Sequence, residues 1–101
     1  MITIEIKGNK DFIQSIKIYG HAGYASRGYD IVCAAVSTLV TSAVNYITAF
    51  GKLVTYKDDE DIVFIENIQE DATVNTILLT MIEMCTGLAE DYKDNILIKY
   101  I

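Results

Sequence analysis

The sequence predicts an α+β domain in which two long helices pack on a five-stranded sheet, in the order ββαββαβ. Three observations support this fold. Short segments with apolar residues at every second position are separated by turn-forming residues, which is typical of strands. Two longer segments carry apolar residues three or four apart, which is the spacing of one helix face. The length of 101 residues suits one domain, so we expect residues 1–101 to fold as a single unit.

The first two strands are expected to form a hairpin. Ile2, Ile4 and Ile6 alternate with polar residues, and a second alternating segment covers residues 12–20. Residues 8–11 between them have the composition of a turn.

A segment with three glycines, residues 20–29, follows and is expected to be a loop, because glycines at this spacing disfavour both helix and strand. Asp30 is a good N-cap for the next helix, since its carboxylate can accept the backbone N–H of Cys33. Gly51 gives a stop signal at the other end. The apolar face of this helix is expected to consist of Val32, Val36, Leu39, Ala43, Ile47 and Phe50.

The second half of the chain repeats this order of elements. Residues 52–56 and 62–66 are short, β-branched and aromatic, so we expect a second hairpin that turns at the acidic residues 58–61. A second helix is expected after Asp71, with an apolar stripe that includes Cys85. The last strand, residues 96–101, is apolar on both faces, and a sheet with one face in water does not favour that pattern. We therefore expect a second copy to cover it, which predicts a homodimer.

Composition excludes several classes of protein. A hydrophobic fraction of 51% argues against disorder, and two cysteines are too few for a disulfide scaffold. No apolar run reaches about 18 residues, and the first residues alternate like a strand rather than a signal peptide, so no membrane association is expected. We therefore expect a cytoplasmic protein whose two cysteines are free thiols. One histidine and two cysteines without a Cys-x-x-Cys pair predict neither a metal nor another cofactor.

The charges are unevenly distributed along the chain. Residues 1–57 carry six basic and three acidic side chains, whereas residues 58–101 carry two basic and eleven acidic ones. The whole chain has a net charge of −6, and nucleic-acid affinity comes mostly from Lys and Arg on phosphates. Direct nucleic-acid binding is therefore not expected, and the acidic residues 58–61 are interpreted as a solvated turn.

His21 and Cys33 are the candidates for chemistry. The glycine-containing loop joins them, and Cys33 falls in the first turn of a predicted helix, where unpaired N–H groups stabilise a thiolate and can bind an oxyanion. An imidazole nearby can accept the thiol proton. Simpler structural interpretations stay open: Cys33 as a core residue, His21 as a loop residue, and Asp30 as a cap only. Ser37, one turn after Cys33, either supports the site or donates to the Cys33 carbonyl.

A long motif adds to this pattern. It closely resembles the signature of the bacterial ribosomal-processing cysteine proteases, the Prp or YsxB-like family, which reads Gly-His-Ala, a glycine-containing spacer, and Gly-x-Asp-Ile-Val-Cys-Ala-Ala-Val-Ser. Here the matching residues are Gly20-His21-Ala22-Gly23-Tyr24-Ala25 and Gly28-Tyr29-Asp30-Ile31-Val32-Cys33-Ala34-Ala35-Val36-Ser37. The resemblance implies that Cys33 is the nucleophile and His21 the base, with Asp30 and Ser37 in support. Arg27 lies in the variable spacer and has no implied role.

The resemblance also implies a function. Members of this family are cysteine endopeptidases that remove the N-terminal extension of bacterial large-subunit ribosomal protein twenty-seven before ribosome assembly, and they are homodimers. The loop would then be a lid over substrate, with Gly20, Gly23 and Gly28 giving it freedom. Tyr24 and Tyr29 would contact an aromatic or large apolar residue before the cut, or both would be ordinary loop anchors. The alternatives are a non-catalytic ribosome-associated or RNA-binding factor, and a redox thiol protein, which would lack a Cys-x-x-Cys partner.

Overall fold

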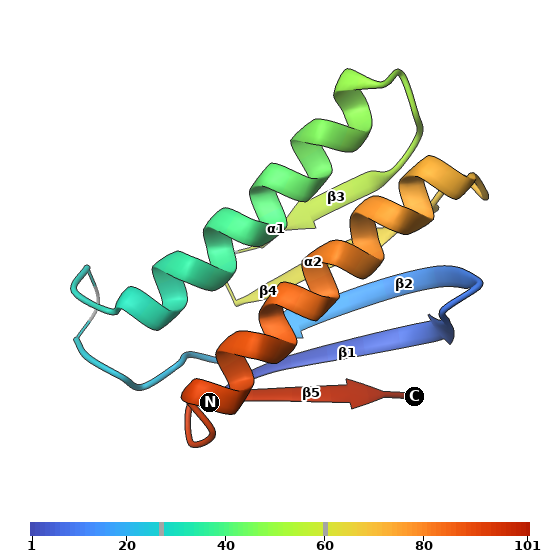
Figure 1. Cartoon of the computed structure of the whole chain (residues 1–101). Coiled ribbons are helices and arrows are strands. Elements are labelled where there is room, and N and C mark those ends of the chain that lie inside the picture. The colour runs from blue at the N-terminus through green and yellow to red at the C-terminus, as the bar shows by residue number, and fades with distance from the viewer. Residues whose placement is uncertain (27, 60) are drawn as a thin grey trace.

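A computed structural model describes residues 1–26, 28–59 and 61–101 and confirms the predicted order of elements (Figure 1). Arg27 of the motif spacer and Glu60 of the acidic run lie outside the described residues. The elements are β1 (Ile2–Asn9), β2 (Phe12–Tyr19), α1 (Ile31–Ala49), β3 (Thr55–Asp58), β4 (Ile62–Glu66), α2 (Ala72–Asp91) and β5 (Ile96–Tyr100).

The five strands form one sheet in the order β3-β4-β2-β1-β5. Both expected hairpins are present, because β1 pairs antiparallel with β2 and β3 pairs antiparallel with β4. The last strand differs from the others: β5 pairs parallel with β1. Parallel strands must be joined by a connection that crosses the sheet. Here α2 makes this connection, because it carries the chain from β4 over β2 and β1 to the edge where β5 lies.

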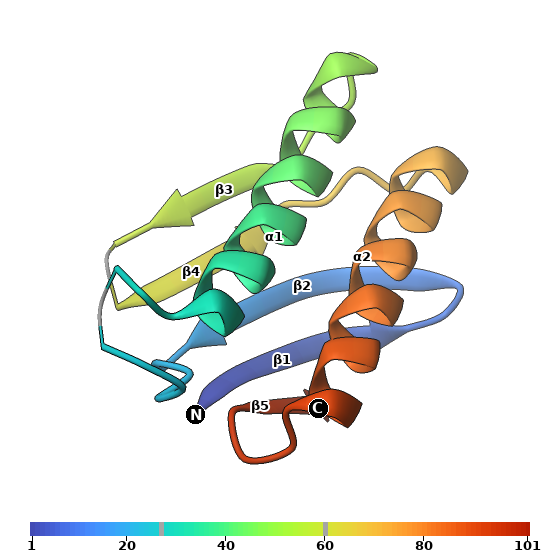
Figure 2. The same ribbon diagram turned by 60° about the vertical axis from the view of Figure 1, so that its left-hand side comes forward.

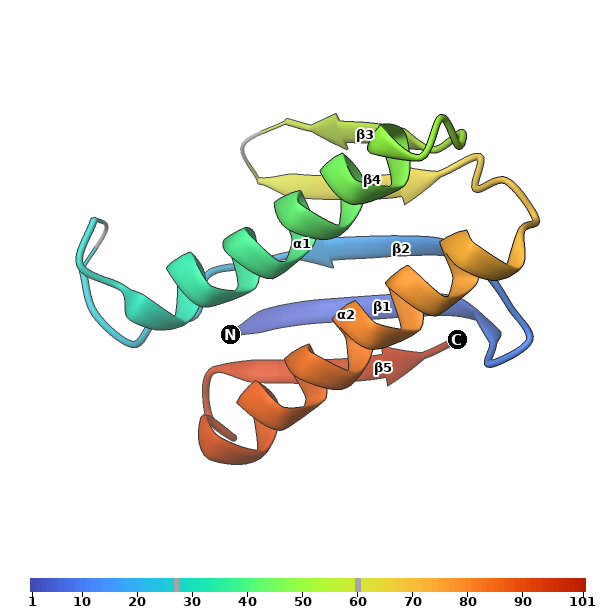
Figure 3. The same cartoon turned by 45° about the horizontal axis from the view of Figure 1, so that its top comes forward.

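Both helices cover the same face of the sheet, and no helix or strand of the described residues covers the other face (Figures 2 and 3). The isoleucines predicted to alternate inward are buried against the helices, as Ile2, Ile4 and Ile6 show with at most 3% exposure. The predicted stripe of α1 was wrong at one position, because Phe50 is exposed, whereas Leu39 is half-buried and packs against the core. The residues of α1 that are buried are Val32, Val36, Val40, Ala43, Val44 and Ile47.

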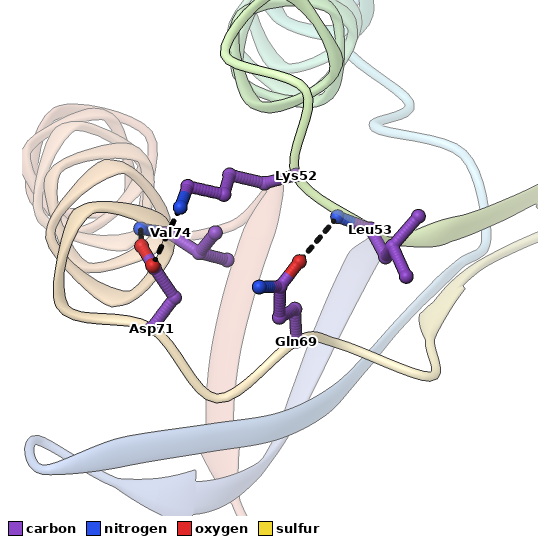
Figure 4. Close-up of polar contacts among 5 residues, drawn as sticks. All are labelled: Lys52, Leu53, Gln69, Asp71 and Val74. Atoms are coloured by element: carbon purple, nitrogen blue, oxygen red, sulfur yellow. Dashed lines mark hydrogen bonds and ion pairs between the residues drawn. The ribbon is translucent and has the colours of Figure 1, made fainter.

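The connecting segment before β3 and the one before α2 are joined by hydrogen bonds and an ion pair, and this contact shortens β3 (Figure 4). Residues 52–56 were predicted as a strand, but β3 begins only at Thr55. Leu53 instead exchanges hydrogen bonds with Gln69, through its N–H to Oε1 at 3.0 Å and through its carbonyl at 2.9 Å. Lys52 pairs with Asp71 at 3.0 Å, and the same Asp71 carboxylate caps α2 by accepting the Val74 N–H at 3.1 Å.

The two helices carry apolar side chains on the surface that faces away from the sheet as well as on the surface that faces it. An open groove of about 660 Å³ runs between α1 and α2, and its lining residues, none of them charged, include Leu39, Tyr46, Ile77 and Met84. Both helices are long and apolar enough to cross a membrane by length and composition, with mean hydropathies of 1.6 and 1.4. Core helices meet the same criterion, and here each helix lies against the sheet with part of its apolar surface buried.

Candidate active site

Cys33 lies in the first turn of α1, at the end of the sheet where the loop from β2 reaches the helix (Figure 1). Its side chain is half-buried and its thiol is free. Asp30 is the N-cap, with an extended backbone, and its Oδ1 accepts the N–H groups of Val32 and Cys33, both at 3.0 Å. The cap therefore fixes the peptide that carries the thiol.

The second oxygen of the same carboxylate holds the loop. Asp30 Oδ2 accepts the N–H of Tyr24 at 3.0 Å and the N–H of Ala25 at 3.3 Å. The Cys33 N–H, and then those of Ala25, Tyr24 and Val32, lower the pKa of Asp30 below its ordinary value, so this carboxylate is ionised at neutral pH. Asp30 thus joins the loop to the helix start through four backbone donors.

These hydrogen bonds bear on two of the expected roles. Within residues 1–26, 28–59 and 61–101, no hydrogen bond joins Asp30 to the His21 imidazole, so the contacts seen for Asp30 are those of a cap and a loop anchor. First-turn N–H groups were predicted as candidate oxyanion donors, and two of them, those of Val32 and Cys33, donate to Asp30, the Cys33 contact being the one that an Asp30 cap predicts. An oxyanion bound by the Cys33 N–H must compete with this carboxylate for it.

His21 is exposed and lies two residues beyond the end of β2. Its neighbours in the chain are constrained. Gly20 has φ +88°, and a Cβ there would collide with the Met1 carbonyl oxygen, so glycine is required. Ala22 on the other side is only 1% exposed. In the described part of the chain no hydrogen bond joins the His21 imidazole to the Cys33 thiol, and catalytic contacts of this kind often tighten only when substrate binds.

The two loop tyrosines differ in their surroundings. Tyr29 is 79% exposed, and its backbone N–H donates to the Ser26 carbonyl at 3.0 Å. Tyr24 packs edge-to-face on Tyr92, with ring centroids 5.5 Å apart and an interplanar angle of 89°. Gly23 precedes Tyr24 and Gly28 precedes Tyr29, and their positive φ angles of +69° and +91° let the chain turn before each tyrosine. Tyr24 is therefore held against the end of α2, whereas the ring of Tyr29 projects from the loop.

Within the described residues, the side chains of the two remaining candidates, Ser37 and Cys85, make no hydrogen bond to His21 or Cys33. Ser37 is exposed on α1, and in the part of the chain that the structure describes its hydroxyl makes no hydrogen bond to the Cys33 carbonyl. Cys85 is fully buried on α2, as its place on the apolar stripe predicts, and burial raises the pKa of its thiol to about 11. Among the described residues, no three His, Cys, Asp or Glu side chains are grouped to hold a metal ion.

Sequence reasoning missed a contact from the opposite end of the chain. The Asn95 side-chain amide donates to the Ala22 carbonyl at 2.8 Å, next to His21. Nothing local in the sequence marks Asn95, because it follows Ala22 by 73 residues and meets it only through the pairing of β5 with β1.

A thiol at a helix start, reached from the preceding strand by a loop that carries the only histidine, is the arrangement of a hydrolase with a cysteine nucleophile. The chain belongs to the family of the cysteine protease Prp, whose family model matches residues 1–97. It is 30% identical to the ribosomal processing cysteine protease Prp of Staphylococcus aureus over 99% of both chains. It is 32% identical to the protein of the same name from Bacillus subtilis, over 95% of this chain and 94% of that one.

Solved structures show the same fold. The S. aureus protease in complex with a covalently linked product peptide matches with a TM-score of 0.93 and 27% identity, over the full length of both chains. The same protease in complex with a substrate peptide matches with a TM-score of 0.87 and 26% identity, again over both full lengths. A Streptococcus mutans protein matches with a TM-score of 0.85 and 29% identity, over all of this chain and 94% of that one.

Proposed function

We propose that this protein is an endopeptidase that removes the N-terminal extension of large-subunit ribosomal protein twenty-seven. One observation carries the proposal: the complete Gly-His-Ala to Cys-Ala-Ala-Val-Ser motif lies on a loop and helix start whose fold matches a ribosomal processing protease that holds a covalently linked peptide. Membership of the cysteine protease family supports the reaction class. The particular ribosomal protein follows from the resemblance of the motif.

In the proposed reaction, His21 takes the thiol proton and the Cys33 sulfur attacks the carbonyl carbon of the scissile peptide. The carbon–nitrogen bond then breaks, and His21 gives its proton to the leaving amine. Water next loses a proton to His21 and attacks the thioester, which releases the extension and returns the proton to Cys33. Movement of the loop would bring the His21 side chain to the thiol.

The loop tyrosines support a preference for an aromatic or large apolar residue just before the cut. The exposed Tyr29 ring is available to such a side chain, and Tyr24 already makes one edge-to-face contact of the kind expected. Contacts made only on closure would couple recognition to assembly of the reactive pair, so a poor substrate would lose kcat as well as affinity.

The test is cleavage of a peptide that spans the junction of the extension, followed by mass spectrometry. Wild-type protein should cut at one bond, and Cys33→Ala and Cys33→Ser should cut nowhere while keeping their far-UV circular dichroism. Cys85→Ala is the matched control and should cleave normally. A Cys33→Ala variant that restores ribosome assembly in cells would instead favour a non-catalytic ribosome-associated factor.

Substrate selection needs a second experiment. Peptides with phenylalanine or alanine before the cut should differ in kcat/KM, and Tyr29→Ala should reduce that difference. Equal kcat/KM across the series would contradict the aromatic preference. A preference that survives both Tyr24→Ala and Tyr29→Ala would place the pocket outside the loop.

We also propose that the protein works as a homodimer in the cytoplasm. The outer residues of β5 are exposed, as Leu97 shows at 46%, but the uncharged groove between α1 and α2 is the stronger candidate for the contact. Two chains of net charge −6 repel each other, and this repulsion is weakest where the contact surface is uncharged. Light scattering should show that Tyr46→Glu gives a monomer. If Leu97→Glu alone does so, the contact is through β5, and a monomeric wild type would exclude the dimer.

A further inference from the structure

We propose that Asn95 is a positioning residue that sets the backbone of His21 for catalysis, a role that rests on the proposed function. The imidazole itself is exposed and has no hydrogen bond to the thiol within the described residues, whereas the backbone around it is held by contacts on both sides. Two contacts flank it: Gly20 lies tight against Met1, and the Ala22 carbonyl accepts the Asn95 amide at 2.8 Å.

Asn95 is itself held by the fold. Its backbone N–H donates to the Tyr92 carbonyl at 2.9 Å, at the end of α2, and its carbonyl accepts the Ile2 N–H at 2.8 Å, at the start of β1. Its side chain is half-buried. Asn95 therefore joins three parts of the fold: the end of α2, the start of β1 and the Ala22–Gly23 peptide, one residue beyond His21. A hydrogen bond from so fixed a donor restricts the Ala22 peptide more than a bond from a mobile side chain would.

The turn between α2 and β5 is also linked to Cys33, through the loop between β2 and α1. Tyr92 packs on Tyr24, the Tyr24 N–H donates to Asp30, and Asp30 accepts the Cys33 N–H. Figures 1 and 3 show this turn at the same end of the sheet as the loop between β2 and α1. The turn is thus linked to both members of the proposed pair, to His21 through Ala22 and to Cys33 through Tyr24 and Asp30.

The chemistry requires a neutral amide at this position. The partner is a carbonyl oxygen, so the side chain must donate, and a carboxylate of the same size would place negative charge against it. Asn95→Asp therefore removes the donor with little change in volume, and Asn95→Ala removes the whole contact. The chain offers a matched control in Asn75, whose Oδ1 accepts the Ile13 N–H at 2.9 Å and whose Nδ2 donates to the Lys10 carbonyl at 2.8 Å. That contact lies at the hairpin of β1 and β2, at the other end of the sheet (Figure 2).

The experiment compares Asn95→Ala, Asn95→Asp and Asn75→Ala in peptide cleavage and in thermal unfolding. Both Asn95 variants should lower kcat by about 10- to 100-fold with KM nearly unchanged, because a misplaced base slows chemistry rather than binding. Asn75→Ala should lose stability and keep its kcat. The double variant Asn95→Ala with His21→Ala should be no slower than His21→Ala alone, because Asn95 acts through His21. Fully additive losses, or the same kcat in Asn95→Ala and Asn75→Ala, would overturn the proposal.

A second readout needs no peptide and separates this proposal from the proposed function. Alkylation of Cys33 by iodoacetamide at pH 7 should slow in Asn95→Ala towards the rate of His21→Ala, because a displaced imidazole no longer helps to form the thiolate. If wild-type protein cleaves no extension peptide but shows this slowing, the substrate assignment fails and the role of Asn95 stands. If Asn95→Ala is alkylated at the wild-type rate, the role of Asn95 fails whatever the peptide result.

Discussion

Selective alkylation of the two cysteines gives a direct measure of which thiol the fold prepares for chemistry. Cys85 is fully buried on α2, and burial raises the pKa of its thiol from 9.0 to about 11. At pH 7 a thiol with that pKa is ionised in about one molecule in ten thousand, against about one in a hundred for an unshifted thiol. Reagent must also reach it through local opening, which lowers its rate further. Cys33 is half-buried at a helix start, so reagent reaches its thiol more easily than that of Cys85.

The assay is a time course with limiting iodoacetamide at pH 7, read by intact mass and by peptide mapping. Native protein should take up one label, on Cys33, and Cys85 should react at least about a hundredfold more slowly. Cys33→Ala should remain unlabelled over the same period, and in denaturant both cysteines should react. Labelling of Cys85 as fast as Cys33 in the native protein would refute the assignment of Cys33 as the prepared thiol.

Three further outcomes are expected. His21→Ala should lower kcat by about 10²- to 10⁴-fold, because no other histidine can replace it; cleavage near the wild-type rate would remove His21 from the mechanism. The lowered pKa of Asp30 means that its carboxylate contributes stability above the unfolded pKa and loses it as pH falls through the folded pKa, below about 4. When stability is measured against pH, Asp30→Asn should lose less stability than wild type below pH 4. Asp71, whose pKa is also lowered, accounts for part of the acid loss that Asp30→Asn still shows. The same loss below pH 4 in Asp30→Asn and wild type would contradict this. Cys85→Ala should lower the free energy of unfolding by about 1 kcal/mol and the melting temperature by several degrees, with unchanged cleavage. An unchanged melting temperature would contradict the packing role of Cys85.

Local patterns in the sequence determine most of the elements and point to the candidate site. Alternation over Ile2, Ile4 and Ile6, the Asp30 cap and the stripe around Cys85 depend on neighbours within a few residues, so they can be read without knowing the fold. The motif from Gly20 to Ser37 is also continuous in the chain. It predicts the reaction class because the loop and the helix start are built by that one segment.

Tertiary structure decided the features that depend on distant partners. Alternation cannot say which strand lies beside β5, and its parallel pairing with β1 follows from where α2 crosses the sheet. β3 begins late because Leu53 meets Gln69, and Phe50 is exposed because α1 ends at Ala49 and Phe50 lies beyond it as the C-cap. The Asn95 amide reaches the Ala22 carbonyl only once the start of β5 and the loop after β2 lie at the same end of the sheet. Side-chain periodicity records which face of an element is buried, whereas the partner across a contact depends on the path of the whole chain.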